Sequence, residues 1–185
     1  MVSRVINIVL VLAALSGLVQ AEDSGGVWLD VPFVKQEKDG CGAASIAMLM
    51  RYWQRQQGEP AAPDVEEIQR ALYTPRARGA YASAMIRYLE QHGFRTFAFQ
   101  GDWKDLQKHL EKGRPLIVAL CVGRDAHHYV VVTGLDWQQD VVLKNDPAER
   151  KLLKQGRTDF EKEWKAAGYW TLLAVPRQGD PVSAP

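Results

Sequence analysis

Cysteine is scarce in this chain of 185 residues, which contains only Cys41 and Cys121. Two cysteines are too few for a disulfide-stapled scaffold or for a cysteine-rich zinc site. The sequence also lacks a His-Glu-x-x-His motif, which argues against a zinc protease, and we expect no metal and no cofactor. It shows no repeat with a period of about 20 to 50 residues, so it does not predict a solenoid.

Neither sign of charge is in clear excess, because 23 basic and 22 acidic side chains give a net charge of +1. Proteins with an extended nucleic-acid surface usually carry a basic excess, so we expect no nucleic-acid partner. Hydrophobic residues make up 46% of the chain, with six Trp, six Tyr and five Phe among them. This composition excludes an intrinsically disordered chain, and the length suits one domain with a sizeable core.

The first 21 residues have the pattern of a secretory signal peptide. Arg4 supplies the positive charge, residues 5–15 form an apolar run interrupted only by Asn7, and Ala21 ends a Val-Gln-Ala cleavage site. The run is shorter than the roughly 20 residues of a membrane-spanning helix, which favours cleavage over an uncleaved anchor. We therefore expect export to the periplasm or secretion. The mature chain would have no membrane span and 22 basic and 22 acidic residues, because Arg4 is the only charge removed.

The remainder of the chain alternates helical and strand patterns. The expected helices cover residues 41–53, 63–72, 81–92, 102–113 and 158–167, and the expected strands cover 94–99, 116–122, 128–135, 141–144 and 169–175, after an extended segment at 27–34. Helices dominate the first half and strands the second, which predicts an α+β domain with helices packed against an antiparallel sheet. We expect this domain to span residues 22–176 and a flexible tail to span 177–185.

The sequence around Cys41 indicates nucleophilic chemistry. Asp39-Gly40-Cys41-Gly42 directly precedes a strong helical pattern, and the positive end of a helix favours the thiolate, the nucleophilic form of cysteine. Glycine on both sides keeps the backbone close and leaves the sulfur open to a ligand. The side-chain amide of Gln36, just upstream, is suited to stabilise an oxyanion. A later histidine and an acidic residue can complete a set that activates the thiol.

Three stretches in this order resemble the bacteriocin-processing, double-glycine (C39-like) peptidase family. They are Gln36-Glu-Lys-Asp-Gly-Cys41-Gly-Ala-Ala-Ser, His128-Tyr-Val-Val-Val and Asn145-Asp146-Pro147. The resemblance implies a papain-like cysteine protease fold. It also implies that Cys41 is the nucleophile, His128 the general base and acid, Asp146 the orienting carboxylate and Gln36 an oxyanion donor. Substrates of the family are leader peptides that are cut after two small residues, usually Gly-Gly.

The chain also departs from the best-known members of that family, which are domains of ATP-hydrolysing membrane exporters. It has no phosphate-binding Gly-Lys motif and begins with a signal peptide, so it resembles the stand-alone, exported branch. Exporter domains often have an acidic residue directly before the cysteine and the glutamine one position farther upstream. Here Gly40 precedes Cys41, and Gln36 lies five residues before it.

Two alternatives concern the cysteines and histidines. A Cys41–Cys121 disulfide is possible in an exported protein and would block nucleophilic chemistry, although the apolar strand around Cys121 indicates a buried core residue. His127 and His128 are adjacent, and successive strand residues point to opposite faces, so only one of them can face Cys41. The periodicity does not decide between them, because residues on both faces are apolar; the resemblance favours His128.

Two further alternatives concern a turn and a tryptophan. Asn145 and Asp146 both belong to an Asn-Asp-Pro turn signal, in which either side chain can serve its own backbone. Either type can also orient an imidazole, and the resemblance favours Asp146. Trp137, which lies near a predicted turn, is a candidate for lining a substrate cleft.

The sequence therefore predicts an exported cysteine peptidase that binds a peptide or protein substrate, with processing after Gly-Gly or similar residues in a secretion or maturation pathway. One alternative is a non-catalytic peptide-binding module on the same fold. Another is a transamidase or amidase that uses the same triad.

Overall fold

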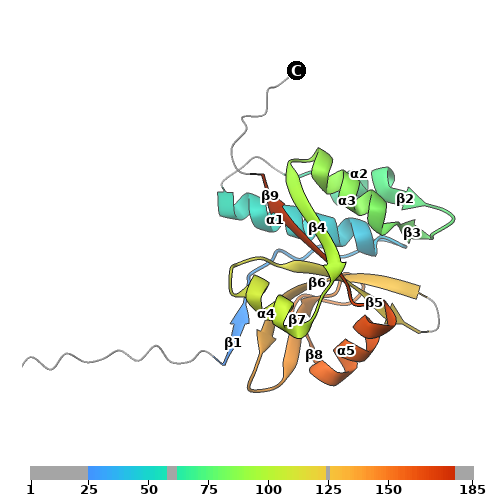
Figure 1. Ribbon diagram of the computed structural model, residues 1–185. Coiled ribbons are helices and arrows are strands. Elements are labelled where there is room, and N and C mark those ends of the chain that lie inside the picture. Colours follow the sequence, from blue (N-terminus) through green and yellow to red (C-terminus); the bar gives the residue numbers. More distant parts are fainter. Residues whose placement is uncertain (1–24, 58–61, 124–125, 178–185) are drawn as a thin grey trace, which may run out of the picture.

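The computed structural model describes residues 25–57, 62–123 and 126–177 (Figure 1). The predicted signal peptide and the tail beyond Arg177 lie outside the described residues, so the division into 1–21, 22–176 and 177–185 stays a prediction. Arg177 itself is still attached to the fold, because its backbone N–H donates to the carbonyl of Gly93 at 2.8 Å. No helix in the described ranges is long and apolar enough to cross a membrane.

Helices and strands alternate along the described chain. The helices are α1 Cys41–Gln57, α2 Val65–Leu72, α3 Ala82–Gln91, α4 Trp103–Leu110 and α5 Arg157–Ala166. The strands are β1 Gly26–Trp28, β2 Tyr73–Thr74, β3 Gly79–Ala80, β4 Phe94–Gln100, β5 Leu116–Val122, β6 Ala126–Asp136, β7 Val141–Asn145, β8 Leu153–Gly156 and β9 Trp170–Pro176.

A seven-stranded antiparallel sheet forms the centre of the domain, in the order β4-β9-β5-β6-β7-β8, with β1 added to β6. The long strand β6 organises it. Its first part pairs with β5, its last residues pair with β1, and β7 runs along its other edge, with a register shift between Val132 and Gly134. A separate two-stranded hairpin, β2–β3, lies at the side of the helices.

Helices cover both faces of this sheet. Figure 1 shows α1, α2 and α3 on one side and α4 and α5 on the other. Strand β5 shows the division residue by residue: Ile117 and Ala119 join the core beneath α1–α3, whereas Val118 and Leu120 join the core beneath α4 and α5. Both cores are buried, which explains why β5 is apolar at successive positions.

Most expected elements are confirmed within a few residues. Helix α1 begins at Cys41, and Asp102 caps α4 through a capping box with Asp105, with hydrogen bonds of 2.8 and 3.1 Å. The prediction omitted the β2–β3 hairpin and β8. These strands have two to four residues, too few to show a strand periodicity.

Candidate active site

Cys41 occupies the first position of α1, where the helix meets strand β6. Ser45, one turn farther along α1, is fully buried, and its hydroxyl donates to the backbone carbonyl of Tyr129 at 3.2 Å. This bond ties the helix that carries Cys41 to the strand that carries His128. Gly42 permits a second close approach, because a Cβ at that position would lie 2.9 Å from the Cβ of Ala80 in the hairpin. The beginning of α1 is therefore held from two sides.

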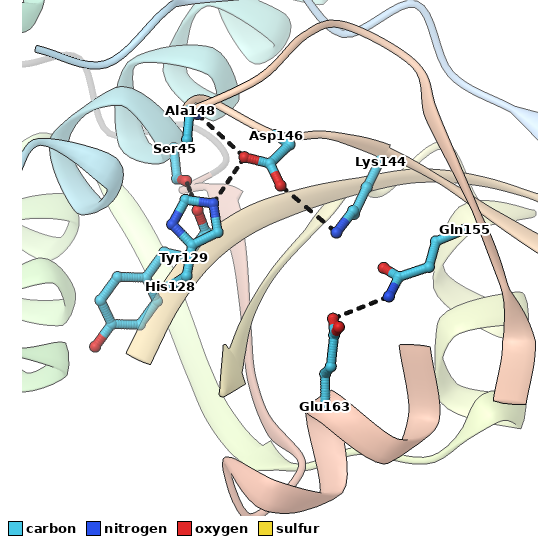
Figure 2. A network of polar contacts seen from close by, with 8 residues as sticks. All are labelled: Ser45, His128, Tyr129, Lys144, Asp146, Ala148, Gln155 and Glu163. Carbon is cyan, nitrogen blue, oxygen red and sulfur yellow. Dashed lines mark hydrogen bonds and ion pairs between the residues drawn. The ribbon is translucent and has the colours of Figure 1, made fainter. Parts of the chain in front are cut away.

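His128 lies on β6, and Asp146 follows the end of β7. Figure 2 shows the imidazole facing the carboxylate, with His128 Nε2 and Asp146 Oδ1 2.7 Å apart. Asp146 Oδ1 also accepts from the backbone N–H of Ala148 at 3.1 Å. The side chains of His128 and Asp146 are 17% and 6% exposed. Cys41 also acts on this imidazole, since it is among the causes that raise the pKa of His128. Residues from α1, β6 and the turn after β7 thus line one cavity.

The electrostatics favour a charged imidazolium. Burial acts to lower the pKa of His128, but the hydrogen bonds and negative charges of Asp146 and Cys41 outweigh it and raise that pKa from 6.5 to about 9. Burial acts to raise the pKa of Asp146, and His128, Lys144 and the N–H of Ala148 together lower it below 3.8. His128 and Asp146 therefore form an ion pair at neutral pH.

Tyr129 belongs to the α1–α3 core and also lines the cavity beside Cys41. Its ring packs edge-on against Trp170, with the ring centres 5.4 Å apart. Burial, with a smaller contribution from the negative charge of Cys41, raises the pKa of Tyr129 to about 12. Tyr129 therefore stays neutral and forms an apolar wall beside the thiol.

Gln36, the expected oxyanion donor, lies beside the same cavity as Cys41. Its backbone N–H donates to the carbonyl of Pro147 at 2.9 Å, which links this segment to the turn that carries Asp146. The side-chain Oε1 of Gln36 is buried without a hydrogen-bond partner among the described residues. The amide thus lines the same cavity as the thiol, and its oxygen forms no hydrogen bond among the described residues.

Asn145 and Asp146 have different surroundings. Asn145 is fully buried and points away from the imidazole: its Nδ2 donates to the carbonyl of Val31 at 3.1 Å, and its Oδ1 accepts from the N–H of Leu152 at 3.0 Å. Asn145 therefore holds two loops together, whereas Asp146 faces His128.

Cys121 and Trp137 differ from expectation. Both thiols are free in the structure, and Cys121 is partly exposed near the end of β5, across from the exposed His127, rather than buried in the core. The last residues of β5 lie outside both cores, since Val122, which follows Cys121, is 50% exposed. Trp137 is 40% exposed and does not line the cavity beside Cys41, because it lies at the opposite end of β6 from His128.

A cavity of about 1360 Å³ opens beside Cys41. The β2–β3 hairpin borders it on one side, with Arg76 and Arg78, and β8 and α5 border it on the other. The cavity therefore lies between two parts of the fold, and Cys41 and His128 are both accessible from it. Within the described ranges, no group of three or more His, Cys, Asp or Glu side chains is arranged to hold a metal ion.

Sequence reasoning missed two parts of this site, the hairpin and Lys144. Lys144 lies on β7, and its Nζ is 3.5 Å from Oδ2 of Asp146, opposite the oxygen that bonds His128 (Figure 2). The spacing contains a signal for it, because residues two apart in a strand share one face. A buried lysine is nevertheless rare, so the residue type gave no reason to place it inside.

Comparisons with known proteins identify the same architecture. The profile of the family described as "Peptidase_C39 like" matches residues 28–172, which is 145 of the 185 residues. No curated protein matches the sequence.

Several solved structures are similar in fold. A double glycine motif protease from an AMS/PCAT transporter, in complex with its leader peptide, shares 21% identity with a TM-score of 0.64, covering 82% of this chain and 95% of that one. The peptidase domain of Streptococcus ComA, a bi-functional ABC transporter, shares 22% identity with a TM-score of 0.63, covering 78% and 98%. A chain described as a C39-like peptidase from Bacillus anthracis shares 20% identity with a TM-score of 0.61, covering 83% and 99%.

These structural likenesses confirm the predicted α+β, papain-like peptidase fold. The family match covers more than three quarters of the chain, and it includes Cys41 and His128 as well as Gln36 and Asp146. The chain therefore belongs to the C39-like peptidase family and is a cysteine-type peptidase.

Proposed function

We propose that this peptidase is exported and hydrolyses peptide bonds with a triad of Cys41, His128 and Asp146. One observation carries the proposal: the imidazole of His128 bonds Asp146 at 2.7 Å and lines the same open cavity as Cys41, which begins a buried helix. A nucleophile, a base that it contacts and a group that orients the base make up the arrangement required for covalent acyl transfer.

In the proposed mechanism, each ring nitrogen of His128 has its own role. Nε2 is engaged by Asp146, so Nδ1 is the nitrogen left to face the thiol of Cys41. In the first step the thiolate attacks the substrate carbonyl carbon, and the carbonyl π electrons move to oxygen. The amide of Gln36 and the free N–H groups at the start of α1 are suited to stabilise that oxyanion.

The second half of the reaction begins with the proton that the imidazolium of His128 carries. The imidazolium of His128 donates it to the leaving amine as the C–N bond breaks, which leaves an acyl group on Cys41. His128 then removes a proton from water, the resulting hydroxide attacks the thioester, and the acid product leaves while the thiolate is restored. No metal or cofactor is required for these steps.

The substrate we propose is an exported peptide or protein with two small residues before the cleaved bond, usually Gly-Gly. The support is family membership and the fold shared with a double glycine motif protease bound to its leader peptide. Export is supported by the signal-peptide pattern of residues 1–21. N-terminal sequencing of the purified protein tests it, because cleavage would make Glu22 the first residue.

The test of the activity uses purified protein, a leader peptide that contains Gly-Gly, the same peptide with Leu-Leu in its place, and casein. We expect cleavage after Gly-Gly and none after Leu-Leu, and the Cys41→Ala variant should lose activity. Product masses distinguish the reactions, since hydrolysis adds one water and transfer adds an amine. A reduced, folded protein that cleaves none of the three substrates would overturn the proposal, and cleavage of casein alone would overturn the specificity.

A further inference from the structure

Lys144 is a buried cation directly beside the proposed triad. The residue is 5% exposed, and its Nζ lies 3.5 Å from Asp146 Oδ2. Among the described residues, this carboxylate is the only ion-pair or hydrogen-bond partner of the ammonium group. The two oxygens of Asp146 are therefore divided, with Oδ1 on His128 and Oδ2 facing Lys144.

Burial of this ammonium group is not required to satisfy Asp146. The carboxylate already accepts hydrogen bonds from His128 and from the N–H of Ala148. Removing an ammonium from water costs several kcal/mol, and a buried ion pair often stabilises a fold no better than apolar side chains of the same volume. An apolar residue at 144 would serve packing equally well, so the charge itself calls for another explanation.

Polar groups of β8 and α5 lie on the side of Lys144 away from Asp146. Gln155 on β8 lies on the other side of it in Figure 2 and donates from Nε2 to Glu163 Oε2 on α5 at 2.9 Å. The Oε1 of Gln155 is buried without a partner among the described residues. The titratable groups drawn with Lys144 in Figure 2 are His128, Asp146 and Glu163. The same cavity is also lined by Cys41, Glu149 and Lys154.

We propose that Lys144 is a positioning residue of the peptidase reaction, whose charge keeps Asp146 ionised and turned so that Oδ1 faces His128. This inference rests on the proposed function. Lys144 does not touch the reacting atoms and acts through Asp146. Its charge is among the causes that lower the pKa of Asp146, after burial, which opposes it, and the contribution of His128.

The test compares Lys144→Met, which removes the charge at similar volume, with Lys144→Arg, which keeps it. Lys151→Met is the matched control, because Lys151 pairs with Asp30 on the surface and lies outside the cavity. Two measurements are made across about pH 4 to 10: kcat/KM for the Gly-Gly peptide, and the rate of Cys41 alkylation by iodoacetamide.

For Lys144→Met we expect kcat/KM at pH 7 to fall about tenfold, as is common when a partner of an orienting group is removed. Removing a positive charge raises the pKa of every neighbouring group, so both limbs of the pH profile and the alkylation curve should move up by about one pH unit. In Lys144→Arg, both limbs of the pH profile should lie at the same pH as in the wild type. Lys151→Met should match the wild type in both measurements.

A merely structural role would lower the rate equally at every pH. A Lys144→Met profile without displaced limbs, or an equal displacement in Lys144→Arg, would therefore overturn the inference. If Lys144→Met does not fold, Lys144→Gln, which keeps a donor without the charge, replaces it under the same criteria. A wild-type protein that cleaves no peptide overturns the proposed function, while the alkylation curves still decide whether Lys144 acts on Cys41, His128 and Asp146.

Discussion

Replacing Asp146 with Asn tests the electrostatic basis of the site. The substitution preserves the size of the side chain and removes the negative charge beside His128. In the wild type, the rise of the His128 pKa from 6.5 to about 9 corresponds to about 3 kcal/mol in favour of the imidazolium. Without that charge, burial, which is already the largest single influence and lowers the pKa of His128, is opposed by Cys41 alone. We expect its pKa to fall to 6.5 or below.

The consequence at pH 7 is large. A group with a pKa of about 9 is roughly 1% neutral at pH 7, whereas a group at 6.5 is roughly three quarters neutral. The imidazolium, which we propose protonates the leaving amine, would thus become the minor species in Asp146→Asn. The loss of imidazolium alone should lower kcat/KM at pH 7 by at least about fourfold, together with a displaced basic limb of the pH profile.

Nuclear magnetic resonance of the imidazole C–H signals measures this directly. The chain has four histidines, and the His128→Gln variant identifies the relevant signal by its loss. Asp140→Asn is the matched control, since Asp140 is exposed and pairs with Arg157 on the surface. A His128 that titrates near 9 in Asp146→Asn, or near 6.5 in the wild type, would refute the electrostatic argument.

Three further predictions concern stability. Asn145→Ala leaves two buried backbone groups without partners and should cost about 2–3 kcal/mol in urea denaturation; a loss below about 1 kcal/mol would contradict the bridging role. Gly42→Ala places a Cβ 2.9 Å from that of Ala80 and should lower the free energy of unfolding by about 1–3 kcal/mol, which a lower Tm would show. An unchanged Tm would show that the hairpin moves aside without loss of stability. The raised pKa of His128 should stabilise the fold fully below pH 6.5, and this contribution should be lost as the pH rises through about 9. The lowered pKa of Asp146 should stabilise the fold above pH 3.8, and this contribution should be lost at more acidic pH. Urea denaturation at several pH values measures both, and His128→Gln, in which the alkaline loss should vanish, is the control.

The helix that carries Cys41 was predictable because its sequence has no breaker after Gly42 and is apolar on nearly every side. Such a segment can only be a buried helix or a buried strand, and its length favours the helix. The structure buries it beneath the sheet and starts it at Cys41. Local sequence was sufficient there because the signal is long and uniform.

The choice between His127 and His128 was not predictable from periodicity, and the fold explains why. Strand β6 lies between two hydrophobic cores, with Val130 in one and Val131 in the other. When both faces of a strand are buried and apolar, the alternation of apolar and polar residues no longer shows toward which face a given side chain points. The family resemblance favoured His128, which is the residue that the structure places against Asp146.

Lys144 and the β2–β3 hairpin depend on tertiary contacts that no short sequence window contains. The hairpin has two residues in each strand, and it lies near α1 because Gly42 leaves room for Ala80. Lys144 is buried only because β8 and α5 close over β7. Both features border the cavity, so the parts of the site most dependent on packing were the least visible in the sequence.

Alkylation of Cys41 compared between the wild type and His128→Ala is the most direct test of the central claim, that Cys41 is a nucleophile activated by His128. Iodoacetamide modification is followed by mass spectrometry from about pH 5 to 9, with Cys121 in the same chain as an internal reference for a free thiol. We expect Cys41 to react faster than Cys121 at pH 6, and we expect this advantage to disappear in His128→Ala. Equal reactivity of the two thiols in the wild type, or a Cys41 rate unchanged by His128→Ala, would contradict it.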